Sequence, residues 1–187
     1  CSSDLDLSKD NTILSCAKHF IAYGAAQAGR DYHTVDISER ELRDTYLPPF
    51  KAAIDAGAAT VMSAFNEYDG VPCTANSFLM RDLLRKEIGF KGFVVSDYTA
   101  VKELIAHGVA GNDEEAASLG MNAGVNMCMV DNLYLFHGEK LVKEGVVREE
   151  TVNELCAEIL TMKYKLGLFD DPYRYGSEEK EKSTIFN

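Results

Sequence analysis

The fold is decided by residues 92–97, with the sequence GFVVSD, and by the similar stretch at residues 59–65, ATVMSAF. Each is a short, mostly apolar run that ends on polar residues, as is typical of a strand in a parallel sheet. Residues 13–20 (ILSCAKHF) and 125–130 (VNMCMV) have the same character. A helical pattern follows each run. The chain is therefore predicted to form four βα units, with a parallel sheet buried on both faces.

Helix signals lie between the predicted strands. Ser38, followed three residues later by Glu41, reads as a capping box and predicts a helix that stops at Gly57. Pro48 and Pro49 within it predict a kink or a break. Five further helices are predicted, at residues 76–88, 100–107, 113–122, 135–144 and 149–166. From residue 168 onwards, including the charge run 178–182, the sequence predicts an irregular, solvated linker.

Polar side chains recur at the carboxyl ends of the predicted strands. They are Lys18 and His19, Ser63 and Asn66, Ser96 and Asp97, and Asn126. Active sites of (β/α)8 barrels are assembled at that end of the strands. No glycine-rich phosphate motif follows any strand, which weakens a nucleotide-binding alternative. Four units make half of a barrel, and 187 residues fall short of the roughly 250 of a whole one. The predicted fold is half of a (β/α)8 barrel.

Composition narrows the class of protein. The formal net charge is −11 at pH 7 and hydrophobic residues make up 46% of the chain, which excludes disorder and argues against a nucleic-acid or anionic-membrane surface. No apolar run approaches the roughly 20 residues of a membrane span. The five cysteines are scattered without the spacing of a zinc site, and the four in apolar segments are expected to be buried free thiols.

Asp97 is the first candidate for chemistry. It lies where a strand becomes a helix, so its carboxylate can reach the mouth of a barrel and act as a nucleophile or a base. The alternative is a helix N-cap that only satisfies free backbone donors. Position alone does not separate these two interpretations.

Lys18 and His19 are adjacent, so at most one of them points inward unless the strand bends. They are candidates for donating hydrogen bonds to a polar ligand, and Lys18 is also a candidate Schiff-base lysine. The alternative is a rim lysine and a structural histidine. The loop at residues 29–33 (GRDYH) is compatible with a sugar site or with a solvated loop containing a local Arg–Asp pair.

Several strings, in this order and spacing, carry a resemblance to a known family. They are KHF at residues 18–20, LPPF at 47–50, VMSAFN at 61–66, GFKGFVVSD at 89–97 and KYKLGLF at 163–169. Together they resemble glycoside hydrolase family 3, in particular its bacterial periplasmic β-glucosidase branch. The resemblance covers nearly the whole chain.

The resemblance implies an architecture and a site. Residues 1–167 would be the C-terminal half of the (β/α)8 barrel, and residues 168–187 a linker towards an α/β sandwich domain that the chain lacks. Asp97 would be the catalytic nucleophile. Lys18 and His19 would bind hydroxyls of the sugar ring, and Met62 and Phe65 would line its subsite. No metal or organic cofactor is implied.

The implied activity is that of a retaining β-glucosidase, which uses two carboxyl groups. In two-domain relatives the acid/base is a Glu on the second domain, so the isolated chain is expected to be nearly inactive. One branch of the family, the β-N-acetylglucosaminidases, carries an Asp-x-His acid/base dyad in the barrel. Asp31 and His33 have that spelling in roughly that place, which makes them an alternative.

Partners and location follow from the same resemblance. The expected substrate is an oligosaccharide or aryl β-glucoside, and the expected protein partners are the first half-barrel and the sandwich domain. The start of the chain as given has no signal peptide, and a periplasmic or extracellular location is implied only by the resemblance. Two other classes stay open: a non-catalytic sugar-binding half-barrel that self-associates through its open sheet edges, and a lyase that uses Lys18.

Overall fold

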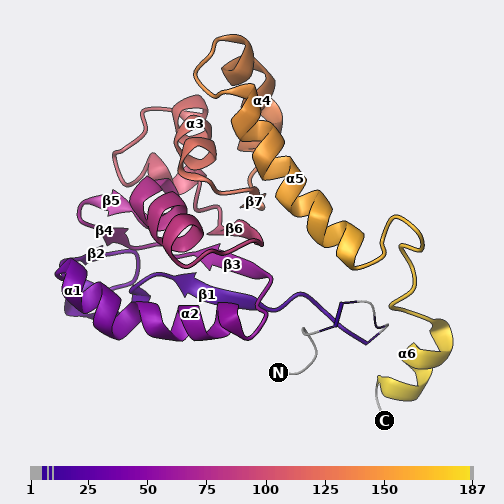
Figure 1. Ribbon diagram of the computed structural model, residues 1–187. Helices are drawn as coiled ribbons and strands as arrows, with labels where there is room; N and C mark the ends of the chain where they lie inside the picture. The colour runs from indigo at the N-terminus through magenta and orange to yellow at the C-terminus, as the bar shows by residue number, and fades with distance from the viewer. Residues whose placement is uncertain (1–5, 8, 10, 186–187) are drawn as a thin grey trace.

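The main sheet of the molecule has four parallel strands. The structure is a computed structural model that describes residues 6–7, 9 and 11–185. The strands are β1 (Cys16–Phe20), β3 (Thr60–Ser63), β6 (Phe93–Tyr98) and β7 (Met127–Met129), and they lie in the order β1-β3-β6-β7. Neighbours in the sheet follow one another along the chain, and helical segments lie between them (Figure 1). This is the arrangement of half of a (β/α)8 barrel, as predicted.

The α-helices connect the strands and then run on past β7. They are α1 (Glu39–Glu41), α2 (Leu47–Asp55), α3 (Asp113–Ala123), α4 (Leu133–Lys143), α5 (Glu149–Lys165) and α6 (Glu178–Thr184). Segments of π-helix occupy Leu42–Tyr46 and Phe78–Glu87. Short 3-10 turns occupy Tyr23–Ala25, Gln27–Gly29, Cys73–Ala75 and Lys102–Leu104. Among the described residues, no helix is long and apolar enough to cross a membrane.

The predicted helix at residues 38–57 shows how its signals act. The Ser38 side chain accepts a hydrogen bond from the Glu41 backbone N–H (3.1 Å), which is one half of the predicted capping box. The prolines occupy the first turn of α2, where a missing N–H costs little. A π-type segment precedes them, and the Leu47 N–H there bonds to the Leu42 carbonyl. The predicted break therefore takes the form of a π-bulge rather than an end of the helix.

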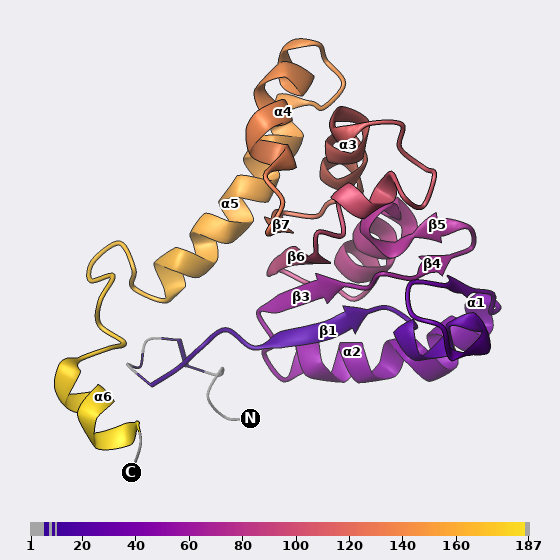
Figure 2. The same cartoon turned by 180° about the vertical axis from the view of Figure 1, so that it is seen from behind.

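A second, smaller sheet was not predicted. It consists of β2 (Thr34–Val35), β4 (Glu67–Tyr68) and β5 (Val71–Pro72), with β4 paired to both neighbours. Asp69 and Gly70 join β4 to β5 with φ values of 53° and 76°, and two left-handed residues in succession are typical of a type I′ hairpin turn. This sheet lies on the side to which the β1 and β3 arrows point in Figures 1 and 2, while α6 lies on the opposite side.

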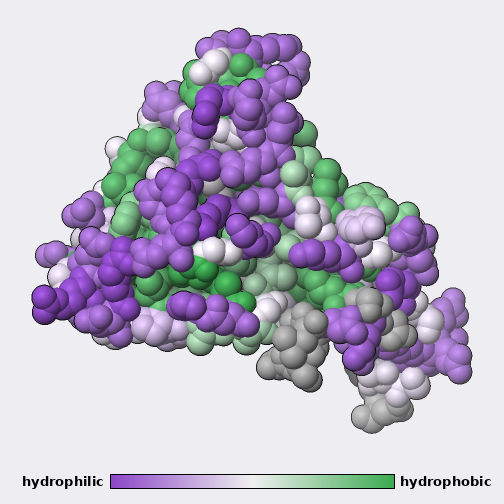
Figure 3. Space-filling view, viewed as in Figure 1, coloured by the Kyte–Doolittle hydropathy of each residue, from purple (hydrophilic) through white to green (hydrophobic). Residues whose placement is uncertain are grey.

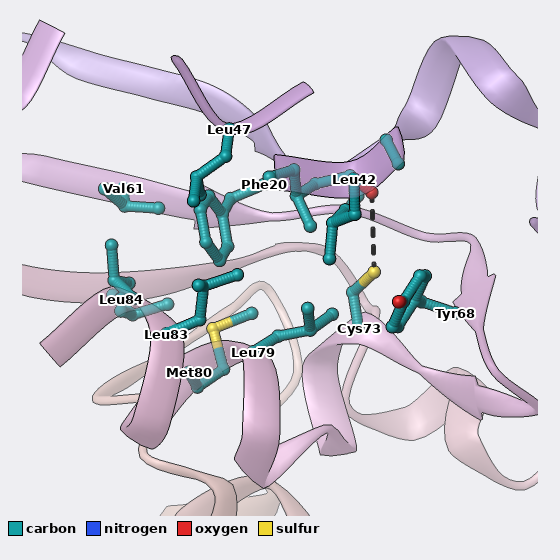
Figure 4. Close-up of a cluster of buried hydrophobic side chains, with 14 of the residues drawn as sticks. Phe20, Leu42, Leu47, Val61, Tyr68, Cys73, Leu79, Met80, Leu83 and Leu84 are labelled. Carbon is teal, nitrogen blue, oxygen red and sulfur yellow. Dashed lines mark hydrogen bonds between the residues drawn. The ribbon is translucent and has the colours of Figure 1, made fainter. Parts of the chain in front are cut away.

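The larger core cluster lies between the sheet and the first two helical segments (Figure 4). Strand residues Phe20 and Val61 meet Leu42 and Leu47 of one segment, and further side chains come from the Phe78–Glu87 helix. The thiol of Cys73 donates a weak hydrogen bond to the Ile21 carbonyl (3.7 Å), drawn as the dashed line in Figure 4. A second cluster joins α3, α4 and α5. The first cluster packs helical side chains against the sheet, whereas the second packs helices against one another.

A network of polar side chains ties α5 to strand β6; we call it the Arg85 network. Arg85 donates to Glu158 Oε1 (2.6 Å), to Asn126 Oδ1 (2.9 Å) and to the Gly92 carbonyl (3.2 Å). Asn126 accepts from the Val94 N–H (2.7 Å) and donates to Glu158 Oε2 (2.6 Å). These bonds fix the start of the strand that ends at the candidate site.

Three expectations are corrected. The sheet is not buried on both faces throughout, because Phe93 and Val95 are half-buried whereas Val94 is fully buried. An irregular linker was expected over residues 178–182, but α6 forms there with an exposed, charged surface. The expectation of four buried thiols holds for Cys73 only among the described cysteines, because Cys16 and Cys128 are half-buried and Cys156 is exposed on α5; Cys1 lies outside the described residues.

Figure 3 shows how polar side chains cover most of one face of the molecule, with apolar side chains visible in its lower middle.

Candidate active site

The candidate site lies at the carboxyl ends of β1, β3 and β6. Because the strands are parallel, residues that follow them meet at one edge of the sheet. The predicted site residues Lys18, His19 and Asp97 lie within the ends of β1 and β6, and Phe65 follows β3 closely. The structure therefore confirms that these segments share one edge, as the half-barrel requires.

The centre of the site is a contact between His19 and Asp97. His19 Nε2 lies 3.3 Å from Asp97 Oδ2, although 77 residues separate the two along the chain. The Asp97 side chain is only 13% exposed and that of His19 30%. The second oxygen, Oδ1, accepts a hydrogen bond from the Tyr98 N–H (2.7 Å). Oδ1 therefore has a hydrogen-bond donor and Oδ2 has the imidazole beside it, an arrangement that orients the carboxylate for nucleophilic attack or proton transfer.

The alternation of side chains along strand β6 determines the face of the sheet on which Asp97 lies. Val94 and Ser96 are buried on the helix side, so Asp97 points to the other face. The Ser96 hydroxyl accepts from the Met129 N–H (2.8 Å) and thereby joins β6 to β7 beside the site. Thr99 has a φ of 54°, which is unusual for a β-branched residue and is a form of local strain that is common near functional sites.

An irregularity in the pairing of strand β1 with β3 sets the direction of the His19 side chain. Ala17 pairs with Val61 and Phe20 with Ser63, so three steps along β1 match two steps along β3. The extra residue is a β-bulge, and bulges redirect side chains next to active sites. The simple alternation that limits adjacent residues to opposite faces therefore does not apply to Lys18 and His19. Of these two, His19 makes the contact with Asp97.

A series of aromatic side chains begins next to His19 and extends the site away from Asp97. The ring centroids of His19 and Tyr23 are 5.3 Å apart, and those of Tyr23 and Phe65 are 6.2 Å apart. Tyr32 then packs against Phe65 with a centroid distance of 4.3 Å. No motif in the sequence singled out Tyr23. The signal that was available is an aromatic residue in the loop directly after the strand that carries His19.

The other three predicted site residues, Lys18, Met62 and Phe65, do not contact Asp97 in an ion pair. Lys18 is exposed and forms no ion pair with any described residue, so His19 and not Lys18 is the basic side chain beside Asp97. Met62 is 8% exposed and lies beside Val95 in the sheet, and Phe65 is half-buried among the aromatic rings. Their roles in sugar binding stay predictions.

The loop at residues 29–33 is exposed, as expected of a solvated loop, but the predicted local Arg–Asp pair does not form in it. Asp31 accepts hydrogen bonds from the Tyr23 hydroxyl and from the Tyr32 N–H, not from Arg30. The structure shows no hydrogen bond between Asp31 and His33, and both are exposed. Burial, followed by the charges of Glu103, Asp31 and Asp97, raises the pKa of Tyr32 above its ordinary value. Tyr32 therefore lies close to several carboxylates.

Within the described ranges, no group of three or more His, Cys, Asp or Glu side chains is placed to hold a metal ion. The chemistry that this arrangement offers is that of an oriented, largely buried carboxylate with an imidazole beside it. Such a carboxylate can attack an electrophilic carbon or accept a proton.

Comparison with known proteins agrees with this arrangement. The chain matches the family model described as the glycosyl hydrolase family 3 N terminal domain over residues 6–162. It is 43% identical over 171 residues to a periplasmic beta-glucosidase of Salmonella typhimurium and 40% identical over 186 residues to a beta-xylosidase of Formosa agariphila. These alignments cover 91% and 94% of the chain, but only 22% and 26% of the two relatives.

Solved structures give the same result. The crystal structure of a beta-glucosidase from Listeria innocua superimposes with a TM-score of 0.93 at 44% identity, covering 100% of this chain and 26% of that one. A mutant of that enzyme in complex with laminaribiose has the same TM-score and identity. The chain thus spans about a quarter of the length of these relatives. The predicted fold and the predicted resemblance are both confirmed, and the chain belongs to glycosyl hydrolase family 3, as part of the family's N-terminal domain.

Proposed function

We propose that this chain carries the nucleophile of a retaining β-glucosidase-like glycoside hydrolase, and that Asp97 is this nucleophile. The observation that supports the proposal is the fixed carboxylate at the end of β6, with Oδ1 on the Tyr98 N–H and Oδ2 beside His19. Its position at the carboxyl end of a barrel strand is where such enzymes carry their catalytic groups.

In the proposed reaction, an Asp97 oxygen attacks the anomeric carbon of a terminal β-D-glucosyl residue. The bond from that carbon to the leaving oxygen breaks, and the leaving oxygen takes a proton from a general acid. The product of this step is a glycosyl ester of Asp97. A water molecule then attacks the same carbon and gives its proton to the same group, now acting as base, and the Asp97 carboxylate is released.

The other site residues would orient the sugar and the nucleophile. His19 lies close enough to Asp97 to hold the carboxylate in place and to donate a hydrogen bond to it. The exposed Lys18 is proposed to bind sugar hydroxyls, and Met62 and Phe65 to line the space beside the ring. No cofactor is part of this reaction.

The general acid is proposed to come from outside these 187 residues. Among the described residues, no second carboxyl group is hydrogen-bonded to His19 or Asp97, and the relatives are much longer than this chain. The alternative acid/base pair, Asp31 and His33, lacks a mutual hydrogen bond, and Asp31 is occupied by Tyr23. We therefore expect very slow turnover by the chain alone, with the first half-barrel and a second domain as its partners.

The location and the sugar are proposed from the relatives. The protein from Salmonella typhimurium is named periplasmic, and a periplasmic or extracellular location is proposed here as well. A β-xylosyl residue is a second candidate for the sugar, because a relative with 40% identity is named a beta-xylosidase. A glucosyl and a xylosyl reagent used in parallel would separate the two.

The test is covalent trapping with 2-deoxy-2-fluoro-β-D-glucosyl fluoride. Fluorine at carbon 2 slows hydrolysis of the ester, and fluoride leaves without help from an acid. We expect intact mass to increase by one fluorosugar, mapped by peptide analysis to Asp97. Asp97→Asn should abolish the label, whereas Asp55→Asn, at an exposed position in an ion pair with Lys51, should not. A label that persists in Asp97→Asn, or no label on either this chain or the full-length protein, would refute the proposal.

A further inference from the structure

A cavity of about 490 Å³ lies beside the small sheet of β2, β4 and β5. Its volume falls within the roughly 300–1,000 Å³ of small-molecule sites. Its apolar walls are Ile37, Val71 and Phe78, and its polar walls are Glu39, Tyr68 and Asp69. Strand β4 and the turn after it therefore form one side of the cavity, and the start of α1 contributes to another.

The cavity is separate from the candidate active site. Successive side chains of a strand point to opposite faces. Glu67 of β4 points to the segment after β6, where it lies 3.2 Å from His107, so its neighbour Tyr68 points the other way. Among the described residues, neither Asp97 nor His19 lines the cavity.

Tyr68 brings a buried polar group without a partner to this cavity. The side chain is only 6% exposed and belongs to the larger core cluster, beside Cys73 in Figure 4. Its ring stacks with that of Phe78, with centroids 6.5 Å apart and planes at 21°. The Asn76 side chain donates to the Tyr68 carbonyl (3.3 Å), whereas the Tyr68 hydroxyl forms no hydrogen bond with any described residue. Buried hydroxyls are normally hydrogen-bonded, so a ligand in the cavity would supply the missing partner.

Two carboxylates lie near this hydroxyl. Burial is the main cause of the raised pKa of Tyr68, and the charges of Glu39 and Asp69 raise it further. The guanidinium of Arg43 acts in the opposite direction, but it is already paired with Glu39 Oε1 (2.8 Å) and with Glu87. Asp69 is exposed and forms no hydrogen bond or ion pair with any described residue. None of the described lining residues is a cation, so the negative charge at the cavity is only partly compensated.

This combination selects an organic cation on a short apolar chain. Carboxylate and phenol oxygens accept hydrogen bonds from an ammonium group, and aromatic rings attract cations. The net charge of −11 also attracts cations to the surface of the molecule. The apolar walls suit an alkyl chain better than a hard metal ion such as Ca²⁺, which takes about six to eight oxygen ligands.

We propose that this cavity binds an alkylammonium group. The ammonium lies between the Asp69 carboxylate and the Tyr68 hydroxyl, and the alkyl chain packs on Val71 and Phe78. Free amines and the lysine side chains of polypeptides both carry this group. The inference does not depend on the function proposed for Asp97.

The test is an NMR titration of this chain with n-butylammonium at low salt, with n-butanol as the neutral counterpart. We expect saturable shifts of the backbone amide signals of residues 68–71 with the cation and none with the alcohol. Asp69→Asn should weaken binding about two- to fivefold, because it removes one exposed charge. Asn accepts the φ of 53° at this position, so the turn is retained.

A second variant and a control complete the design. Tyr68→Phe keeps the stacked ring and removes only the hydroxyl, so it should weaken binding about two- to tenfold. The control is Asp55→Asn, which changes the net charge by the same amount at an exposed ion pair with Lys51 on α2. Its affinity for n-butylammonium should equal that of the unmodified chain.

Weaker binding in both cavity variants, with unchanged binding in Asp55→Asn, supports the inference. Equal affinity in all variants, equal binding of n-butanol, or the absence of any saturable shift overturns it. Circular dichroism identifies a loss of fold in Tyr68→Phe, and Asp69→Asn, at an exposed position, then decides.

Nα-acetyl-lysine methylamide identifies the source of the ammonium group. Tighter binding than that of n-butylammonium assigns the cavity to a lysine side chain of a polypeptide, and equal or weaker binding assigns it to a free amine. Both results support an alkylammonium site. Failure of both amines to bind overturns it, while the labelling of Asp97 tests the proposed function separately.

Discussion

Replacing Arg85 by Met is expected to destabilise the chain strongly, because it removes the cation from a nearly buried polar network. The Arg85 side chain is 11% exposed and that of Glu158 is 20% exposed. Without Arg85, the Glu158 carboxylate keeps only the hydrogen bond from Asn126, and the Gly92 carbonyl loses its side-chain donor. Removing one partner of a buried ion pair leaves a charge without compensation.

The expected loss is about 2–4 kcal/mol of unfolding free energy, slightly below the full range for buried pairs because both side chains retain some contact with water. The matched control is Arg43→Met, at an ion pair with Glu87 in which the side chains are 32% and 51% exposed. An exposed pair of this kind contributes about 0–1 kcal/mol. The two arginine variants should therefore differ by more than about 1 kcal/mol.

The double variant Arg85→Met/Glu158→Met should be more stable than either single one. Burial raises the pKa of Glu158 above its ordinary value of 4.5 despite the nearby guanidinium, so the ionised pair itself is costly to bury. A carboxyl group with a raised pKa in the folded state contributes stability at low pH that is lost as pH rises through that pKa. The cost of Glu158→Met should accordingly be larger near pH 4.5 than near pH 7.

Urea unfolding followed by circular dichroism measures all of these variants. If the unfolding free energy falls with urea concentration at the same slope in every variant, the differences between midpoints report differences in stability alone. A loss of stability in Arg85→Met no larger than that in Arg43→Met would contradict the expected burial penalty, as would costs of the two single changes that simply add in the double variant.

Two further predictions concern backbone packing and thiol reactivity. A Cβ at Gly92 would lie 1.9 Å from the Ala59 carbonyl oxygen, so Gly92→Ala should lower the unfolding free energy by at least about 1–3 kcal/mol. Gly24→Ala should lower it by less, because there is open space at that position. Thermal unfolding measures both variants, and equal decreases in Tm would contradict this prediction. Iodoacetamide should modify the exposed Cys156 and leave Cys73 unmodified in the folded chain, because burial raises the pKa of the Cys73 thiol to about 12. Peptide mapping by mass spectrometry checks this, and equal labelling of the two would contradict it.

Much of the fold follows from local sequence patterns. The apolar runs that end on polar residues predicted β1, β3, β6 and β7 to within a few residues, because buried parallel strands require continuous apolar segments. Helix capping was equally local, as Ser38 shows. The small sheet of β2, β4 and β5 escaped prediction because its strands are two residues long, too short for any periodic signal.

The helix α6 and the bulge in β1 escaped prediction for other reasons. The run of charges at residues 178–182 satisfies the requirements of an exposed helix as well as those of a linker, and Ser177 caps it by accepting from the Lys180 N–H. The bulge between Ala17 and Phe20 is a property of the pairing of two strands, which no single segment encodes.

Local sequence patterns were enough to establish a parallel α/β chain with polar residues at the carboxyl ends of its strands, and the motifs predicted the family to which the chain belongs. Asp97 was selected in this way, because a local pattern is enough to place a residue at the end of a strand. The contact of Asp97 with His19, rather than with Lys18, and the lining of one cavity by Tyr32, Glu103 and His107 appear only in the folded molecule. These contacts join residues that are about 70 positions or more apart, so their distances depend on strand register and loop path, which are set by packing of the whole molecule.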